Sequence, residues 1–149
     1  MSRNVLTLAQ HEIHTFDVGS SDVPASTVVH IPDLDTVVSG DVVYNGIHLW
    51  LAGSTTATRA AWLTALDTVE ALSPRIIIAG HKDPAAPDDH ANRILDQTRQ
   101  YLSCFDEAAA ACDSPEDLIS AVLARYPSLG NPYTLWVAAN DQPDLIHAQ

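Results

Sequence analysis

The sequence contains little positive charge. Among its 149 residues, 7 are Lys or Arg and 19 are Asp or Glu, so the formal net charge is −12, and Lys82 is the one lysine. A surface this acidic repels nucleic-acid backbones and anionic lipid headgroups. We therefore expect neither nucleic acid nor membrane as a partner, and solubility is the simplest role for the acidity.

Long apolar runs and abundant cysteines are also missing. No stretch approaches the roughly 18 apolar residues of a membrane-spanning helix, and residues 1–6 lack the apolar core of a signal peptide. Cys104 and Cys112 fall within one expected helix, about 12 Å apart along its axis, which is too far for a disulfide. The sequence therefore predicts a cytoplasmic protein with two reduced cysteines.

The composition is that of a globular chain. Hydrophobic residues make up 46% and charged residues 17%, which argues against disorder. A chain of this length is expected to form one domain, residues 1–149, and to bury about 70% of its unfolded surface. Residues 1–10 show no clear period and are compatible with a strand or a loose arm, and residues 141–149 are expected to be a flexible tail.

Three strands are predicted at residues 11–18, 26–31 and 36–40, joined by turn-forming residues in an antiparallel meander. Side chains alternate between the faces of a strand, so His11 and His14 cannot share a face and are disfavoured as a metal pair. No role is assigned to either histidine or to His30.

Helical periodicity begins after this meander. Residues 55–72 repeat apolar side chains at three- and four-residue steps, and the apolar run 75–79 reads as a buried strand that joins the sheet by a crossover. Three more helices are expected: a long one capped by Asp88 or Asp89, one from 114 to 126, and a short one after Gly130. The arginines 59, 75, 93 and 99 are expected to be solvated partners of acids.

Two predicted strands end in the same way. The run before Gly40 leads to Asp41, and the run before Gly80 leads to His81. Residues at the ends of buried strands commonly form sites in α/β proteins, so Asp41 and His81 are expected to share a rim. Alternatively, each caps the turn that follows it.

The segment that follows Asp41 is expected to be irregular from residue 44 to residue 53. Tyr44, His48 and Trp50 lie in it, and loops that carry such residues are often functional. The alternative is that Tyr44 and Trp50 cover the end of the core and that His48 bonds the backbone.

Four motifs follow one another along the chain: Ser26-Thr27-Val28-Val29-His30-Ile31-Pro32, Gly40-Asp41-Val42-Val43-Tyr44-Asn45-Gly46-Ile47-His48, Ala79-Gly80-His81-Lys82 and Gly130-Asn131-Pro132-Tyr133-Thr134-Leu135-Trp136. In this order they resemble the C-terminal half of a metallo-β-lactamase-fold hydrolase, over residues 11–138. The resemblance implies an α/β chain that forms half of an αββα sandwich, with one mixed sheet and helices on one face. It also implies zinc as the metal, with Asp41 bridging two ions and His81 as the last ligand.

The sequence departs from the family where the other ligands belong. The His-x-His-x-Asp-His motif of the family's first half is absent, and the family's middle histidine is replaced by the segment Gly19-Ser20-Ser21. Zinc sites use three or four protein ligands. His48 is the nearest candidate for a third ligand.

Half of a sandwich has an open apolar sheet face, which a soluble monomer does not tolerate. The resemblance therefore implies an obligate homodimer that packs sheet against sheet. The alternatives are a partner chain that supplies the first half, or a chain that is a fragment of a longer protein.

Three functions are compatible with these residues. The first is a small-molecule hydrolase of esters, lactones or thioesters with a reduced metal site at Asp41 and His81. The second is a metal-free cyclase or isomerase in which Tyr44, His48, Asp41 and His81 transfer protons. The third is a ligand-binding or accessory module without catalysis.

Overall fold

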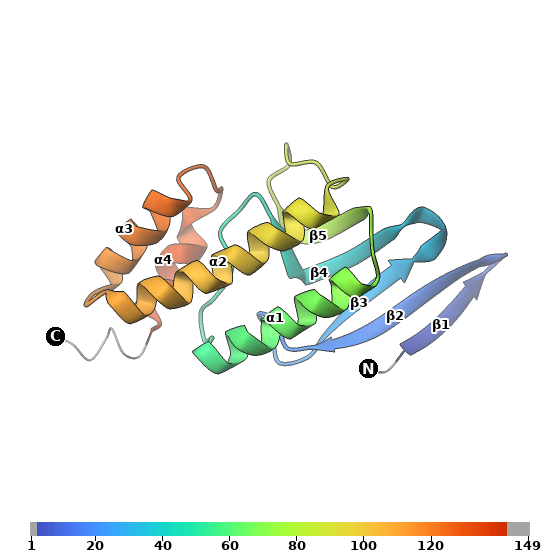
Figure 1. Cartoon of the computed structure of the whole chain (residues 1–149), viewed down its shortest axis with the longest axis horizontal. Coiled ribbons are helices and arrows are strands. Elements are labelled where there is room, and N and C mark those ends of the chain that lie inside the picture. Colours follow the sequence, from blue (N-terminus) through green and yellow to red (C-terminus); the bar gives the residue numbers. More distant parts are fainter. Residues whose placement is uncertain (1–2, 143–149) are drawn as a thin grey trace.

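Five strands form one mixed sheet in the order β1-β2-β3-β4-β5, and the helices lie on one of its faces (Figure 1). The structure, a computed structural model, describes residues 3–142. The strands are β1 Arg3–Leu8, β2 His11–Gly19, β3 Ser26–Ile31, β4 Thr36–Asn45 and β5 Ile76–Lys82. The helices are α1 Thr56–Ala71, α2 Ala91–Ala111, α3 Pro115–Arg125 and α4 Pro132–Asn140, with a 3-10 turn at Pro32–Leu34.

The direction of the strands brings three carboxyl ends to one edge. The pairs β1–β2, β2–β3 and β3–β4 are antiparallel. The pair β4–β5 is parallel because α1 carries the chain back across the sheet between these strands. Strands β2, β4 and β5 therefore run in the same direction and end at the same edge, as expected for the ends of β4 and β5.

The helix starts follow local sequence signals. Thr55 and Thr58 form a reciprocal capping box at α1, and Ser114 Oγ accepts a hydrogen bond from the Asp117 backbone N–H at α3. The predicted cap of α2 is wrong, because His90 occupies that position without a side-chain bond. Asp88 instead accepts hydrogen bonds from Lys82 Nζ at 2.7 Å.

The core lies between the sheet and the two helices that cross it, α1 and α2 (Figure 1). Trp62 on α1 is fully buried, and its Nε1–H donates to the Val42 carbonyl at 2.8 Å. Buried side chains of three strands face these helices: Val28, Val37 and Ile77. Helices α3 and α4 extend the molecule beyond the sheet at one end of α2 (Figure 1).

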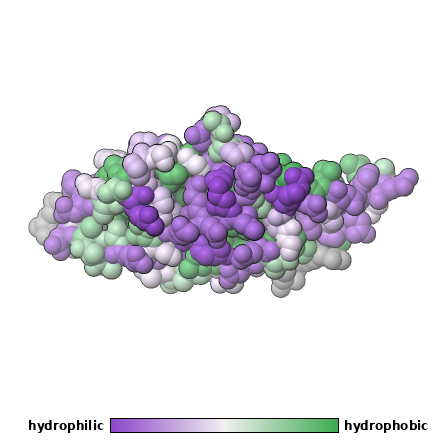
Figure 2. Space-filling view, turned by 45° about the horizontal axis from the view of Figure 1, so that its top comes forward, coloured by the Kyte–Doolittle hydropathy of each residue, from purple (hydrophilic) through white to green (hydrophobic). Residues whose placement is uncertain are grey.

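The opposite face of the sheet has no layer over it among residues 3–142. The pairing register places Thr15, Val29, Val38 and Ile78 in one row on this face. Ile78 is 42% exposed, whereas its neighbour Ile77, on the helix side, is fully buried. The apolar row of this face differs from the surface seen in Figure 2, where hydrophilic residues cover the middle of the molecule.

Several predictions about the chain are resolved by these contacts. Residues 3–8, left open between a strand and an arm, pair with β2 as β1. Strand β4 does not end at Gly40 but continues to Asn45, because Val43 and Tyr44 are buried and β4 resumes its pairing with β5. Most of the expected tail, residues 143–149, lies outside the described residues.

The prediction that Arg59 is solvated is wrong. Arg59 is 3% exposed, and its guanidinium contacts Asp106 Oδ1 at 2.6 Å. Cys104 and Cys112 are free, as predicted. Nowhere in the described part of the chain is a helix both long and apolar enough to cross a lipid bilayer.

Candidate functional site

The shared edge of β2, β4 and β5 gathers four polar side chains, which we name the rim cluster: Asp22, Asp41, Tyr44 and His81. Asp22 follows the end of β2, Asp41 and Tyr44 lie in the last part of β4, and His81 lies near the end of β5. Tyr44 is paired with His81 in the register of the two parallel strands. The predicted proximity of Asp41 and His81 is thus found, and Tyr44 joins them.

Asp41 and His81 form a half-exposed pair. His81 Nε2 lies 3.3 Å from Asp41 Oδ1, and the two side chains are 53% and 48% exposed. Gly80 permits this approach, because a Cβ there would collide with the Asp41 carboxylate and would lie 2.9 Å from the carbonyl carbon of Gly40. The glycine before His81 is therefore part of the site's geometry.

Tyr44 connects the two sides of the cluster. Its ring is buried and stacks on the His81 imidazole with 5.3 Å between ring centroids, and its hydroxyl donates to Asp22 Oδ2 at 3.0 Å. Burial, followed by the charge of Asp22, raises the pKa of Tyr44 far above its ordinary value. Tyr44 therefore remains a phenol and a hydrogen-bond donor. It covers the core and also contacts the site, so both interpretations of this residue apply.

Asp22 is a member of the cluster that the sequence did not single out. Burial raises its pKa, and the nearby Asp41 charge raises it further, while hydrogen bonds from Tyr44 and Ser21 and the proximity of His81 oppose the shift. Asp22 consequently retains its proton to a higher pH than an exposed aspartate. In the sequence it follows a run predicted as a strand, as Asp41 and His81 do, which was the available signal, but the turn-forming residues around it obscured this signal.

Asp22 also lines a small hollow of about 180 Å³. Its other walls come from the β2–β3 turn, the loop before α1 and the first turn of α1, and they include Ser20, Ser54 and Thr58. A hollow of this size accommodates a group of a few non-hydrogen atoms, since a water molecule occupies roughly 30 Å³ in the liquid.

His48 is not on the rim. Its side chain is fully buried, and its Nδ1 lies 2.9 Å from the hydroxyl of Tyr101 on α2. Its backbone N–H donates to the Gly130 carbonyl, and burial lowers the pKa of the imidazole. The expectation that His48 stands beside Asp41 as a third ligand is therefore corrected: His48 is a neutral core histidine that ties its loop to α2.

The donor set does not fit a zinc site built from this chain alone. Zinc takes three or four protein ligands in tetrahedral geometry. Between residues 3 and 142, no three His, Cys, Asp or Glu side chains are grouped to hold a metal. Asp41 and His81 supply two donors, and Asp22 is engaged by Tyr44 and Ser21. We assign no chemical step to a metal.

The capping alternative for Asp41 and His81 finds no support. Within the described residues neither side chain hydrogen-bonds the backbone that follows it, whereas Asp83 Oδ1 accepts from the Ala85 N–H at 2.8 Å in the loop after β5. Trp50, the other aromatic of the irregular segment, is 39% exposed.

The remaining histidines of the meander have their own partners. His11 pairs with Asp33, and His14 lies 2.8 Å from Glu12. The ring of His14 is 6.0 Å from that of His30. None of the three belongs to the rim cluster.

Comparison with solved structures identifies the fold. A metallo-beta-lactamase family protein from Thermus thermophilus matches with a TM-score of 0.60 and 14% identity, over 93% of this chain and 46% of that one. A beta-lactamase domain protein from Burkholderia ambifaria matches with a TM-score of 0.61 and 16% identity, over 93% and 43%. The inverting sec-alkylsulfatase Pisa1 from Pseudomonas sp. matches with a TM-score of 0.64 and 15% identity, over 98% and 26%.

These matches cover nearly all of this chain but less than half of each solved chain. The identities are low, so the matches establish the fold alone. No family model and no curated protein matches the sequence.

Proposed function

We propose that this chain, which has the metallo-β-lactamase fold over about half of that fold's length, is a small-molecule hydrolase that acts on an ester, lactone or thioester. The rim cluster is its acid–base site. The observation that carries the proposal is the contact of His81 Nε2 with Asp41 Oδ1 at 3.3 Å, at the exposed edge where Asp22 and Tyr44 also lie.

His81 is the general base. Its Nε2 lies beside Asp41 Oδ1, so Nδ1 is the ring nitrogen that accepts a proton from water. Asp41 then orients the ring and stabilises the imidazolium that forms. Half exposure of both side chains leaves room for water and for the substrate's carbonyl group.

Asp22 is the general acid. Burial raises its pKa, so Asp22 keeps a proton to a higher pH than an exposed aspartate does. The protonated carboxyl donates this proton to the leaving oxygen or sulfur of the substrate. The hollow of about 180 Å³ beside Asp22 accommodates that leaving group. Tyr44 positions Asp22 through the hydroxyl bond of 3.0 Å.

The test is a screen of ester, lactone and thioester substrates, with metal content measured on the same sample. Asp41→Asn and His81→Ala should each lower the rate by about 100-fold or more, the usual contribution of a positioned acid or base. His90→Ala is the matched control, because His90 is an exposed histidine outside the cluster. Undiminished turnover in His81→Ala would refute the proposal.

The same residues support a second candidate, a cyclase or isomerase. It is favoured by the combination of a base, His81, with a carboxyl whose pKa is raised, Asp22, because proton transfer needs both groups at one site. Exchange of substrate hydrogen with deuterated solvent, without a hydrolysis product, would distinguish it. Ligand binding without turnover that is unchanged in both site variants would indicate an accessory module instead.

We also propose that a second copy of this chain covers the open sheet face. The face carries uncharged residues such as Val29, Val38 and Ile78 in a chain of net charge −12, so two acidic copies meet there with the least repulsion. One copy of this chain matches 46% of the length of the Thermus protein. Two copies would therefore match nearly all of that length. When the same face of both copies packs around a two-fold axis, the assembly stops at a dimer.

Light scattering decides this point. The expected mass is about 32 kDa, twice the 16.0 kDa of one chain, and Ile78→Lys should shift it toward the single chain. The matched control is Leu123→Lys, at an apolar position of α3 that is 36% exposed. A monodisperse 16.0 kDa species would refute the dimer.

A further inference from the structure

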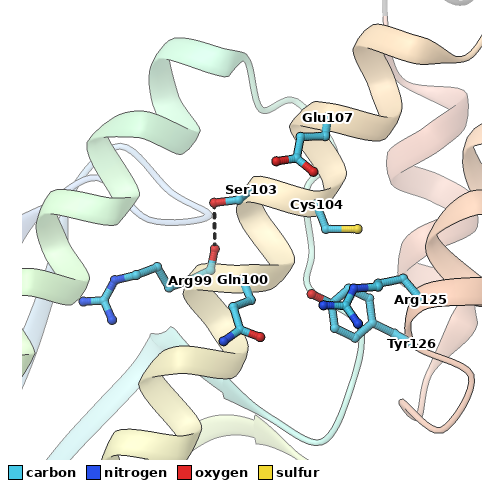
Figure 3. A pocket seen from close by; sticks show the side chains of 7 residues that line it. All are labelled: Arg99, Gln100, Ser103, Cys104, Glu107, Arg125 and Tyr126. Carbon is cyan, nitrogen blue, oxygen red and sulfur yellow. Dashed lines mark hydrogen bonds between the residues drawn. The ribbon is translucent and has the colours of Figure 1, made fainter.

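A second hollow, separate from the rim cluster, lies between α2 and the C-terminal end of α3 (Figure 3). Its volume is about 430 Å³, within the range of small-molecule sites. Cys104 and Glu107 line it from α2, and Arg125 and Tyr126 line it from the end of α3. It shares no residue with the rim cluster.

Arg125 forms no ion pair within residues 3–142, although Glu107 lines the same hollow. No carboxylate of residues 3–142 lies within 4.0 Å of Arg125. Arg99, at the far margin, is paired with Asp67 and Glu70 at 3.0 and 2.9 Å, and Figure 3 shows its side chain turned away from Arg125. In a chain with 19 acids and 7 bases, an unpaired guanidinium beside a hollow is available to an external anion.

The wall next to Arg125 is aromatic and apolar. The Arg125 guanidinium carbon lies 5.8 Å from the centroid of the Tyr126 ring. The Cys104 thiol points toward these two side chains (Figure 3), and burial raises its pKa, so the sulfur stays neutral. The Tyr126 hydroxyl is buried without a hydrogen-bond partner among the described residues, although buried hydroxyls normally have one.

We propose that this hollow binds a small aromatic carboxylate, whose carboxylate group lies on Arg125 and whose ring packs against Tyr126 and Cys104. The planar guanidinium matches a carboxylate through two parallel hydrogen bonds, and aromatic rings gain from stacked or edge contacts. Glu107 lies in the same hollow and repels a second negative charge, so the site prefers a monoanion.

Cys104 reports on occupancy directly. In the full chain carrying Cys112→Ser, Cys104 is the one remaining thiol, and its rate of reaction with a neutral dipyridyl disulfide is measured at increasing naphthoate. We expect saturable protection by naphthoate and at least several-fold weaker protection by cyclohexanecarboxylate and by the uncharged naphthamide. No protection at millimolar naphthoate, or equal protection by naphthamide, would overturn the proposal.

Matched variants distinguish the loss of the Arg125 charge from a loss of folding. Arg125→Met should weaken naphthoate about 10-fold or more, the usual effect of losing a charge-assisted hydrogen bond, and Glu107→Gln should strengthen it. Arg75→Met is the control, because Arg75 is an exposed arginine of a different region. If Arg125→Met fails to fold, Arg125→Lys retains the charge without the planar fork and should bind more weakly than the parent chain. Unchanged protection in a folded Arg125 variant would refute the assignment.

Discussion

Polar side chains of the interior and of the rim cluster are held in different ways. Arg59 is 3% exposed and contacts Asp106 Oδ1 at 2.6 Å, Ser54 Oγ at 2.7 Å and the ring of Phe105 at 5.2 Å. His81 is half exposed, and its one side-chain polar contact within residues 3–142 is with Asp41 at 3.3 Å. The difference indicates that interior groups such as Arg59 contribute to stability, while His81 and Asp41 at the rim remain accessible to solvent.

The largest effect is expected for Arg59→Met. It leaves the partly buried Asp106 without its cation, and breaking such a pair costs on the order of 3 kcal/mol of unfolding free energy. Urea denaturation measures the loss. Arg99→Met, on the more exposed side of α2, is the control and should cost about 1 kcal/mol or less. Equal losses in the two variants would contradict the distinction between interior and surface arginines.

A smaller loss is expected for Gly80→Ala. The added Cβ meets the Asp41 carboxylate and the Gly40 backbone, and forcing a methyl group into a packed position costs about 1 to 3 kcal/mol. The variant should also separate His81 from Asp41 and lower the proposed activity. Gly130→Ala is milder, because its Cβ would lie 3.2 Å from a side-chain methyl group of Ile47. Full stability of Gly80→Ala would show that Asp41 does not lie over β5.

Asp22→Asn should change stability in the opposite direction. The folded pKa of Asp22 is raised above 3.8, so the unfolded chain releases this proton first and stability falls as pH rises from about 3.8 through the folded pKa. Asn removes that loss and should raise the free energy of unfolding at neutral pH, with little gain below pH 3.8. Denaturation across this pH range measures it. A gain that is independent of pH would contradict the sign.

The smallest effect on stability is expected for His81→Ala. The pair with Asp41 is about half exposed, and surface substitutions of this kind change the unfolding free energy by about 0.5 kcal/mol or less. The same variant should lose the proposed activity. A large loss of activity with a small loss of unfolding free energy indicates that His81 has a functional role. A loss of stability comparable to that of Arg59→Met would assign His81 a structural role.

The regular elements were predictable because their signals are local. The alternation of β3, the helical period of α1, and the serine, proline and acids at the start of α3 all lie within a few residues of one another. The shared rim of Asp41 and His81 was also predictable, since a crossover helix requires β4 and β5 to be parallel. The sequence therefore indicated Asp41 and His81 from the strand ends and Tyr44 from the segment that follows Asp41, and of the four members of the rim cluster it missed Asp22.

The remaining features depend on partners distant in the sequence. Asp22 enters the site because Tyr44, 22 residues away, donates to it, and Arg59 is buried because Asp106, 47 residues away, compensates its charge. His48 leaves the rim because Tyr101 on α2 binds its ring. Local patterns determine which segments become helices and strands. Only packing decides which polar side chains are buried, because burying one is tolerated only where another element supplies its hydrogen bond or opposite charge.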